Sequence, residues 1–279
     1  MKKLSLFILI FLTAECVLGR SPTPDNKKTI DNIGLLDESN SYSVDDNGNV
    51  TVSYHNGKDK SKVPLASEIK EYEAAFYVSE EKTAIAYRNG EEESQIQVLT
   101  SDNMGKTWNP HSVLGESVYS PEFIGFTTQN DGYLVTVSGP AMGNEKNHIF
   151  LTSDGGKTWH EIGNTNEVYP RVVTGAFFIN DKIGFLSFRY DGYDTPDPVL
   201  LHTDDAGKTW TKCDILIPDI YKSTTDYATA LSPVFNGKNG VLPVRLQNNN
   251  GNGDPIYTLI HYISSDYGKT WKFVSDDIE

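Results

Sequence analysis

The sequence predicts an all-β fold, a β-propeller of four-stranded antiparallel blades. All four tryptophans of the chain end copies of one eight-residue pattern, and successive copies lie 51, 51 and 61 residues apart. Between the copies, apolar and polar residues alternate with the period of strands, and no stretch has convincing helical periodicity. A repeat of this length is typical of a propeller or a related repeat array.

The eight-residue pattern, called the octamer from here on, reads Ser/Thr, any, Asp, any, Gly, any, Thr, Trp. Its copies are SDNMGKTW (101–108), TSDGGKTW (152–159), TDDAGKTW (203–210) and SSDYGKTW (264–271). Its third and eighth positions hold Asn103, Trp108, Asp154, Trp159, Asp205, Trp210, Asp266 and Trp271. A short acidic side chain pins a turn by accepting backbone N–H bonds, glycine adopts conformations that strain other residues, and tryptophan buries a large apolar face. We therefore expect a structural hairpin turn rather than a ligand or Ca²⁺ site.

A degenerate fifth copy, SYHNGKDK at 53–60, fits the same register upstream. It keeps Ser53 and Gly57, whereas His55 replaces the aspartate and Lys60 replaces the tryptophan. This copy predicts a further repeat at the N-terminal end of the domain.

Each full repeat predicts four strands, with the octamer between the third and the fourth. The expected first strands are 73–78, 122–127, 174–179 and 230–235, and the expected second strands are 83–88, 132–137, 184–189 and 240–245. The N-terminal repeat is shorter, with about three strands at 41–46, 49–54 and 60–65. Four full repeats and one partial repeat predict a five-bladed propeller, with an incomplete ring as the alternative.

The first 19 residues have the features of an export signal. Lys2 and Lys3 precede an apolar run at 4–12 that is too short to span a bilayer, and a cleavage site is expected before Arg20. We expect a secreted or cell-surface protein, with a lipid anchor through Cys16 as the alternative. Residues 20–38 are expected to be a flexible tether, and residues 39–279 the propeller domain.

The composition excludes several classes of partner and chemistry. The net charge of −14 argues against nucleic acid or anionic lipid as the main partner. No later segment is apolar enough to span a membrane, and after the signal only Cys213 remains, so no internal disulfide is expected. The scattered histidines have no metal-ligand spacing and no cofactor motif is visible, so we expect neither a metal nor a cofactor. We expect a monomer.

Three arginines share one place in the repeats. Arg88, Arg189 and Arg245 fall at the last position of three expected second strands, and Val137 holds that position in the fourth. In a propeller this position faces away from the octamers, so three guanidinium groups around one mouth would suit a carboxylate or another anion. The alternative is that each arginine pairs with an acid of its own blade, for example Arg88 with Glu73.

Other polar residues accompany these arginines. Glu73 and Glu122 share a place at the start of two first strands, facing the same mouth. Tyr190 and Tyr193, in one of the polar loops after the second strands, have the chemistry to stack on a sugar, although exposed loop residues explain them as well.

The octamers resemble the aspartate boxes, or BNR repeats, of sialidases and their relatives, which include sortilin-type receptors, some glucanases and photosystem assembly factors. The resemblance covers residues 50–279. In sialidases a glutamate and an arginine of one blade join two further arginines, a nucleophilic tyrosine and an acidic aspartate. The resemblance implies that Glu73 and Arg88 form that pair, that Arg189 and Arg245 bind a carboxylate, and that Tyr227 or Tyr221 is the tyrosine.

The sequence also departs from the sialidase pattern. It has no Phe/Tyr-Arg-Ile-Pro motif before the first octamer and no arginine between Arg20 and Arg88, and Asp45 and Asp46 fall in an expected hairpin turn. Without an acid, glycosidic cleavage loses catalysis worth about 10²–10⁴-fold. We therefore expect a carbohydrate- or protein-binding module more than an enzyme. The alternatives are an exo-sialidase or related glycosidase with a reduced arginine site, and an assembly factor for an exported complex.

Overall fold

The computed structural model describes residues 39–88, 95–114, 120–141, 144–165, 168–189, 197–249 and 253–274. They form two compact units: unit 1 comprises the described residues up to Thr165, and unit 2 those from Val168 onward. The expected signal at 1–19 and tether at 20–38 lie outside the described residues. Within the described part of the chain, no helix is long and apolar enough to cross a membrane.

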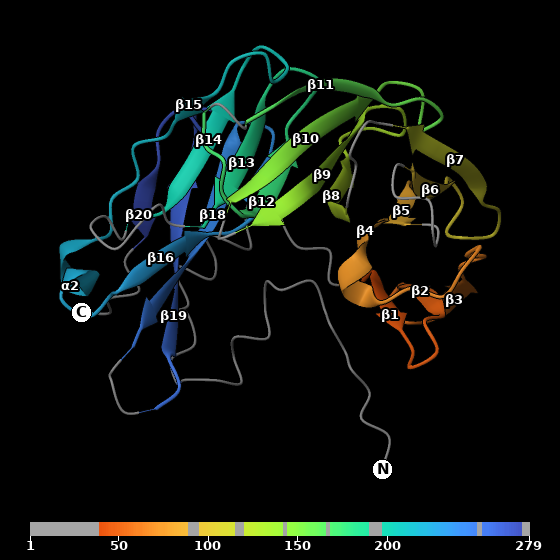
Figure 1. Cartoon of the computed structure of the whole chain (residues 1–279), viewed down its shortest axis with the longest axis horizontal. Coiled ribbons are helices and arrows are strands. Elements are labelled where there is room, and N and C mark those ends of the chain that lie inside the picture. Colours follow the sequence, from red (N-terminus) through yellow and green to blue (C-terminus); the bar gives the residue numbers. More distant parts are fainter. Residues whose placement is uncertain are drawn as a thin grey trace. The chain divides into compact units, whose positions relative to one another are not determined.

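Unit 1 contains three antiparallel sheets (Figure 1). Their strand orders are β1-β2-β3, β4-β5-β6-β7 and β11-β10-β9-β8. The first two sheets comprise β1 (Ser41–Val44), β2 (Val50–Tyr54), β3 (Asp59–Lys62), β4 (Ala74–Val78), β5 (Thr83–Arg88), β6 (Gln95–Ser101) and β7 (Asn109–Leu114). The third comprises β8 (Ser120–Phe126), β9 (Gly132–Ala141), β10 (Asn144–Thr152) and β11 (His160–Asn164). A single turn of 3₁₀ helix, η2 (Glu71–Glu73), leads into β4.

Unit 2 contains two antiparallel sheets, ordered β12-β13-β14-β15 and β16-β18-β19-β20, with β17 paired to β18. The first comprises β12 (Val173–Phe178), β13 (Gly184–Phe188), β14 (Val199–Thr203) and β15 (Thr211–Lys212). The second comprises β16 (Tyr227–Ala230), β17 (Val234–Asn236), β18 (Asn239–Asn248), β19 (Ile256–Ser264) and β20 (Lys272–Val274). A one-turn helix, α2 (Asp219–Lys222), lies between the two sheets in sequence.

The predicted fold class is confirmed: five antiparallel sheets of three to five strands are consistent with propeller blades. Each octamer follows the third strand of its sheet, as expected. The hydrophobic cores lie between neighbouring sheets, because second strands with fully buried side chains pack against the adjacent sheet. Ile85 and Tyr87 of β5 pack with Val52 of the first sheet, and Phe185 of β13 packs with Leu242 of the last sheet.

Several expected strands differ in their bounds from the structure, and two of them are interrupted or shortened. The single strand expected at 230–235 is interrupted at residues 231–233, leaving β16 and β17, and Pro233 has no N–H to donate to a ladder there. The strand after the third octamer, β15, has only two residues, because residues 216 and 217 form hydrogen bonds with Tyr262 and Asp197 instead of continuing the pairing with β14. The Ile217 backbone N–H donates to Asp197 Oδ1 at 2.9 Å, and the Tyr262 hydroxyl donates to the Leu216 carbonyl at 2.8 Å.

Candidate functional site

The octamers form one end of each sheet and engage their acidic side chains in hydrogen bonds. Asp154 Oδ1 accepts the Thr158 N–H at 2.9 Å and the Thr152 hydroxyl at 2.9 Å, and its Oδ2 accepts the Thr158 hydroxyl at 2.6 Å. Burial alone would raise the pKa of Asp154, but these bonds outweigh it and lower the pKa to about 2. Bonds from Thr209 and Thr270 lower the pKa values of Asp205 and Asp266 to about 2 in the same way.

Asn103 forms the same turn with an amide. Its Oδ1 accepts the Thr107 N–H at 2.9 Å, while its Nδ2 donates to the Thr107 hydroxyl at 2.8 Å. The threonine hydroxyl therefore accepts where Thr158 donates, and the turn needs no negative charge. In the degenerate copy, His55 instead contacts Asp59 at 2.7 Å and Glu80 at 3.0 Å, and these acids raise its pKa.

Within each unit, octamer glycines and tryptophans join a sheet to the one before it. A Cβ on Gly105 would lie 2.6 Å from Ser61 Cβ in β3, one on Gly156 would lie 3.0 Å from Thr100 Cγ2 in β6, and one on Gly268 would overlap Phe185 in β13. Trp108 and Trp271 pack on the cores between the same pairs of sheets. The octamer end is therefore built as a brace.

The opposite end of the sheets carries the predicted site residues. In unit 1, Arg88 is the last residue of β5, as expected, and is half-buried. Glu73 is the last residue of η2 rather than the first of β4, and its carboxylate lies 3.7 Å from Lys70 Nζ. Residues 70–73 turn instead of extending, because the Glu73 N–H donates to the Lys70 carbonyl. The described ion pair of Glu73 is thus with Lys70; pairing with Arg88 stays a prediction.

Glu122 is the described acid with the most raised pKa. It is the third residue of β8, which begins at Ser120. The pairing of β8 with β9 shifts between Pro121 and Phe123, so Glu122 is the extra residue of a bulge. Although its residue surface is exposed, nearby protein atoms desolvate the carboxyl group and raise its pKa to about 7, and the negative charge of Glu145 on β10 adds to the rise. The glycine-containing segment around Glu145 has no sequence pattern typical of a strand, so the sequence does not predict that Glu145 acts on Glu122.

In unit 2, the two predicted arginines keep their register but end up in different settings. Arg189 lies just after β13, whereas Arg245 lies inside β18, which continues to Asn248. Arg189 and Arg245 therefore occupy equivalent positions when the repeats are aligned. Only Arg189 lies at a strand end, however, since β18 and β19 extend into a long hairpin. Arg88 belongs to unit 1 and the other two to unit 2, so their convergence on one mouth stays a prediction.

The long hairpin presents a polar and aromatic face. Tyr227, Gln247 and Tyr257 pair directly across β16, β18 and β19, so their side chains share one face of the sheet, as does Arg245 two residues from Gln247. The Arg245 guanidinium lies 5.4 Å from the centroid of the Tyr257 ring. Arg245 is exposed and Tyr257 is 45% exposed. We call these four residues the hairpin face; Tyr257 was not expected, because an exposed tyrosine at a strand start carries no sequence signal.

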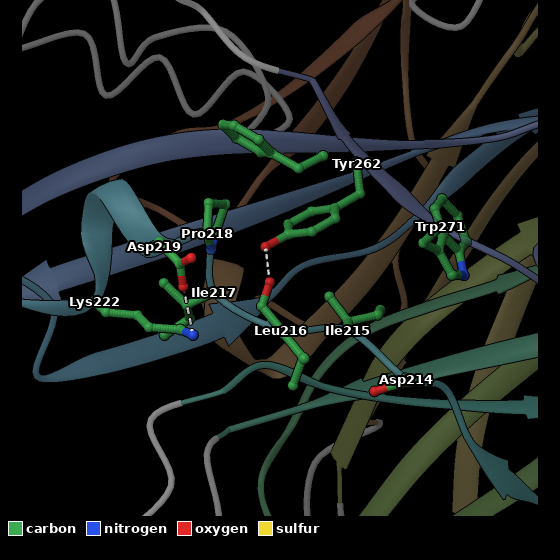
Figure 2. A pocket seen from close by; sticks show the side chains of 10 residues that line it. Asp214, Ile215, Leu216, Ile217, Pro218, Asp219, Lys222, Tyr262 and Trp271 are labelled. Atoms are coloured by element: carbon green, nitrogen blue, oxygen red, sulfur yellow. Dashed lines mark hydrogen bonds and ion pairs between the residues drawn. The ribbon is translucent and has the colours of Figure 1, made fainter.

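A second feature of unit 2 is an open pocket of about 380 Å³ beside α2 (Figure 2). The segment 214–219 lines it together with Lys222, Tyr262, Trp271 and Phe273. Lys222 pairs with Asp219 at 2.7 Å, which neutralises both charges, and Leu216 is 59% exposed. Tyr221, one of the two expected nucleophile candidates, packs edge-on against Phe273 with centroids 6.1 Å apart. The pocket is therefore lined by both apolar and polar groups, and Lys222 and Asp219 of its lining form an ion pair.

The remaining expectations concern the tyrosines of one loop and metal binding. Tyr190 and Tyr193 lie outside the described residues. Among the residues that the structure describes, no three His, Cys, Asp or Glu side chains are grouped to hold a metal ion.

A family model described as a BNR repeat-like domain matches residues 72–276 of the chain. No curated protein sequence matches the chain.

Solved structures resemble the chain at low identity. An α-L-arabinanase of Penicillium chrysogenum complexed with arabinobiose has 17% identity and a TM-score of 0.50, over 72% of this chain and 65% of its own. A GH93 α-L-arabinofuranosidase of Fusarium graminearum, also with arabinobiose, has 16% identity and a TM-score of 0.51 over the same shares. YCF48 bound to a D1 peptide has 13% identity and a TM-score of 0.44 over 85% of this chain and 78% of its own. The chain spans about two thirds of the length of the first two, and these similarities concern the fold alone.

Proposed function

We propose, from the premise that the chain belongs to the BNR repeat-like domain family, that it is an exported carbohydrate-binding module. The proposal places the ligand at the end of the sheets opposite the octamers. Export is supported by the charged and apolar segment at 1–19. The octamer end is unsuited to binding, because its acids are already engaged in hydrogen bonds within the turn.

The hairpin face carries the proposal. The aromatic ring of Tyr257 offers a flat apolar surface for the C–H groups of a sugar, and the contact with Arg245 holds both side chains in place. The guanidinium keeps planar N–H donors for hydroxyl or carboxylate oxygens. Tyr227 and Gln247, on the same face, add further polar groups beside the ring. This combination of one aromatic platform with a few fixed polar groups is typical of small-ligand sites.

Titration calorimetry with arabinobiose and with sialyllactose tests the proposal. Binding of either sugar is expected, and Tyr257→Ala is expected to weaken it by about tenfold or more, as for other central aromatic contacts. Tyr267→Ala is the matched control, because Tyr267 is 42% exposed but lies in an octamer. Arg245→Gln separates the two sugars: it is expected to reduce binding of the carboxylate-bearing sialoside more than that of arabinobiose. Binding that survives Tyr257→Ala unchanged would contradict the hairpin face as the site.

Glycoside hydrolysis is a second candidate function, favoured by Glu122. A carboxyl group with a pKa near 7 holds a proton at neutral pH and is suited to protonate a leaving group. The adjacent Glu145 would keep its partner protonated by repulsion between like charges.

Incubation with aryl α-L-arabinofuranoside and aryl sialoside tests this second candidate. If the wild type hydrolyses either substrate, Glu122→Gln is expected to lower kcat by about 10²–10⁴-fold, with a smaller effect on KM. No hydrolysis at high protein concentration would leave binding as the function.

A further inference from the structure

Three hydrogen-bonded side chains cross the third sheet of unit 1, one from each of three neighbouring strands. His148 of β10 lies between Ser138 of β9 and Glu161 of β11. The Ser138 Oγ is 3.2 Å from His148 Nε2, and His148 Nδ1 is 2.8 Å from Glu161 Oε1. A serine, a histidine and an acid joined in this way form the arrangement that activates a serine oxygen for nucleophilic attack, whatever their order in the sequence.

The strand pairing places the three side chains on one face of the sheet. Ser138 pairs with Lys146, two residues before His148, and Glu161 pairs with Phe150, two residues after it. Because side chains alternate along a strand, all three lie on the face that carries Phe150. Phe150 belongs to the core between the second and third sheets of unit 1. The three side chains therefore face the second sheet, and Ser138 lies toward the end opposite the octamers.

The hydrogen bonds give each of the three groups a defined role. When the Nδ1–H of a neutral His148 donates to the Glu161 carboxylate, the free electron pair is on Nε2, where it accepts the Ser138 hydroxyl. Glu161 thereby fixes the tautomer and the orientation of the ring. Ser138 is 3% exposed and the His148 side chain 15% exposed, so only a small group can reach the serine oxygen.

Two further polar residues on the facing surfaces suit a carbonyl oxygen. Thr136 pairs directly with His148 and is fully buried, and its Oγ1 has no hydrogen-bond partner within the described part of the chain. Arg88 alternates along β5 with Ala84 and Ala86, which pack into the core between the two sheets. Arg88 therefore projects from β5 on the side of the third sheet. A hydroxyl and a guanidinium both donate hydrogen bonds that stabilise a developing oxyanion.

We propose that Ser138 is the nucleophile of a site that hydrolyses small carboxylic esters, with His148 as the general base and Glu161 as its positioning residue. The low exposure of Ser138 restricts the acyl group to a short one, such as acetyl. The site lies in unit 1 and does not rest on carbohydrate binding at the hairpin face, which belongs to unit 2.

The reaction proceeds in two steps. The Ser138 oxygen bonds to the ester carbonyl carbon while its proton passes to His148 Nε2, and Thr136 and Arg88 stabilise the negative oxygen. The bond to the alcohol oxygen then breaks, and the alcohol leaves with the proton from His148. In the second step, water gives a proton to His148 and bonds to the acyl carbon. The bond to Ser138 breaks, the serine oxygen recovers the proton, and the carboxylic acid is released.

Labelling of the whole chain with a fluorophosphonate tests the nucleophile directly, because an activated serine oxygen displaces fluoride from phosphorus and stays bonded to the label. Peptide mapping by mass spectrometry is expected to find the label on Ser138 of the wild type. Ser112 is the internal comparison: it is exposed and accepts a hydrogen bond from Gln97 Nε2 at 3.0 Å, but an amide cannot take its proton. A Ser138 that stays unlabelled, or is labelled no faster than Ser112, would overturn the proposal.

Hydrolysis of p-nitrophenyl acetate tests the roles of the three residues. Ser138→Ala and His148→Gln are each expected to lower kcat by about 10²–10⁴-fold, whereas Ser112→Ala is expected to leave it unchanged. Glu161→Gln is expected to lower kcat without raising KM, because the ring loses its orientation while the substrate keeps its contacts. Urea midpoints close to that of the wild type show that the variants are folded. Hydrolysis that survives Ser138→Ala, or falls equally in Ser112→Ala, would overturn the proposal.

Discussion

Asp154 and Glu122 belong to the same four-stranded sheet, yet their pKa values move in opposite directions. Asp154 receives hydrogen bonds from Thr152, Lys157 and Thr158, which outweigh its desolvation and lower its pKa to about 2. At Glu122, desolvation and the charge of Glu145 act in the same direction and raise the pKa to about 7. The comparison shows that the repeated octamer acids stabilise the sheet, whereas the acid with a pKa near neutrality, Glu122, is a single residue at the other end of the sheet.

The largest effect is expected from a substitution that disrupts the packing between sheets at the octamer end. Gly268→Ala is expected to lower the free energy of unfolding by about 3 kcal/mol, because the new Cβ would overlap the buried Phe185 ring at a backbone φ of +77°. Gly237→Ala is the matched control, with a φ of +58° and no atom within 4 Å of its Cβ. It is expected to lose only about 1 kcal/mol, from backbone strain alone. Urea unfolding measures both, and equal losses would show that the octamer glycine has no packing role.

A smaller effect is expected when the octamer acid is removed. Asp154→Ala removes the acceptor of four donors and is expected to lower the free energy of unfolding by about 2 kcal/mol at pH 7. Asp154→Asn is expected to lose about 1 kcal/mol or less, because Asn103 forms the same turn with Thr107 as acceptor.

The effect of Asp154 should also depend on pH. Its folded pKa of about 2 lies below its ordinary value of 3.8, so its stabilisation is present above pH 3.8 and is lost as the pH falls toward 2. Urea unfolding at pH 7 and pH 2.5 checks this. A loss for Asp154→Ala that is undiminished at pH 2.5 would contradict the charge-dependent part of the explanation.

The smallest expected effect has the opposite sign and concerns Glu122. Its folded pKa of about 7 lies above the ordinary 4.5, so the folded state becomes less stable as the pH rises from 4.5 to 7 and the carboxylate must form in the protein. Glu122→Gln is therefore expected to raise the melting temperature at pH 8 and to leave it unchanged at pH 4. Thermal unfolding at the two pH values measures the difference, and an effect of the same size at both would contradict the raised pKa.

Much of the fold follows from local sequence signals. The octamers predicted the hairpins and the strand register, because their glycines, acids and tryptophans have one function in one turn, and β5 spans the expected residues 83–88. The interruption between β16 and β17 and the early end of β15 were not predicted, since they depend on tertiary hydrogen bonds such as that of Ile217 with Asp197.

The candidate site was less predictable than the fold. Register alone placed Arg88, Arg189 and Arg245 in equivalent positions, but strand length decides their surroundings, and β18 extends past Arg245. The pKa of Glu122 depends on a bulge in β8 and on Glu145 from another strand, neither of which has a local signal. The contact between Arg245 and Tyr257 likewise depends on cross-strand pairing of residues far apart in sequence.

The contrast between the two ends can be measured in one molecule. Carbon-detected NMR titration of the Asp and Glu carboxyl groups from pH 1.5 to 9 follows Asp154 and Glu122 together, with Asp154→Asn and Glu122→Gln identifying the two resonances. The expected midpoints are about 2 for Asp154 and about 7 for Glu122. Midpoints near the ordinary values of 3.8 and 4.5 for both groups would contradict the contrast between an octamer end with hydrogen-bonded acids and an opposite end with a desolvated acid.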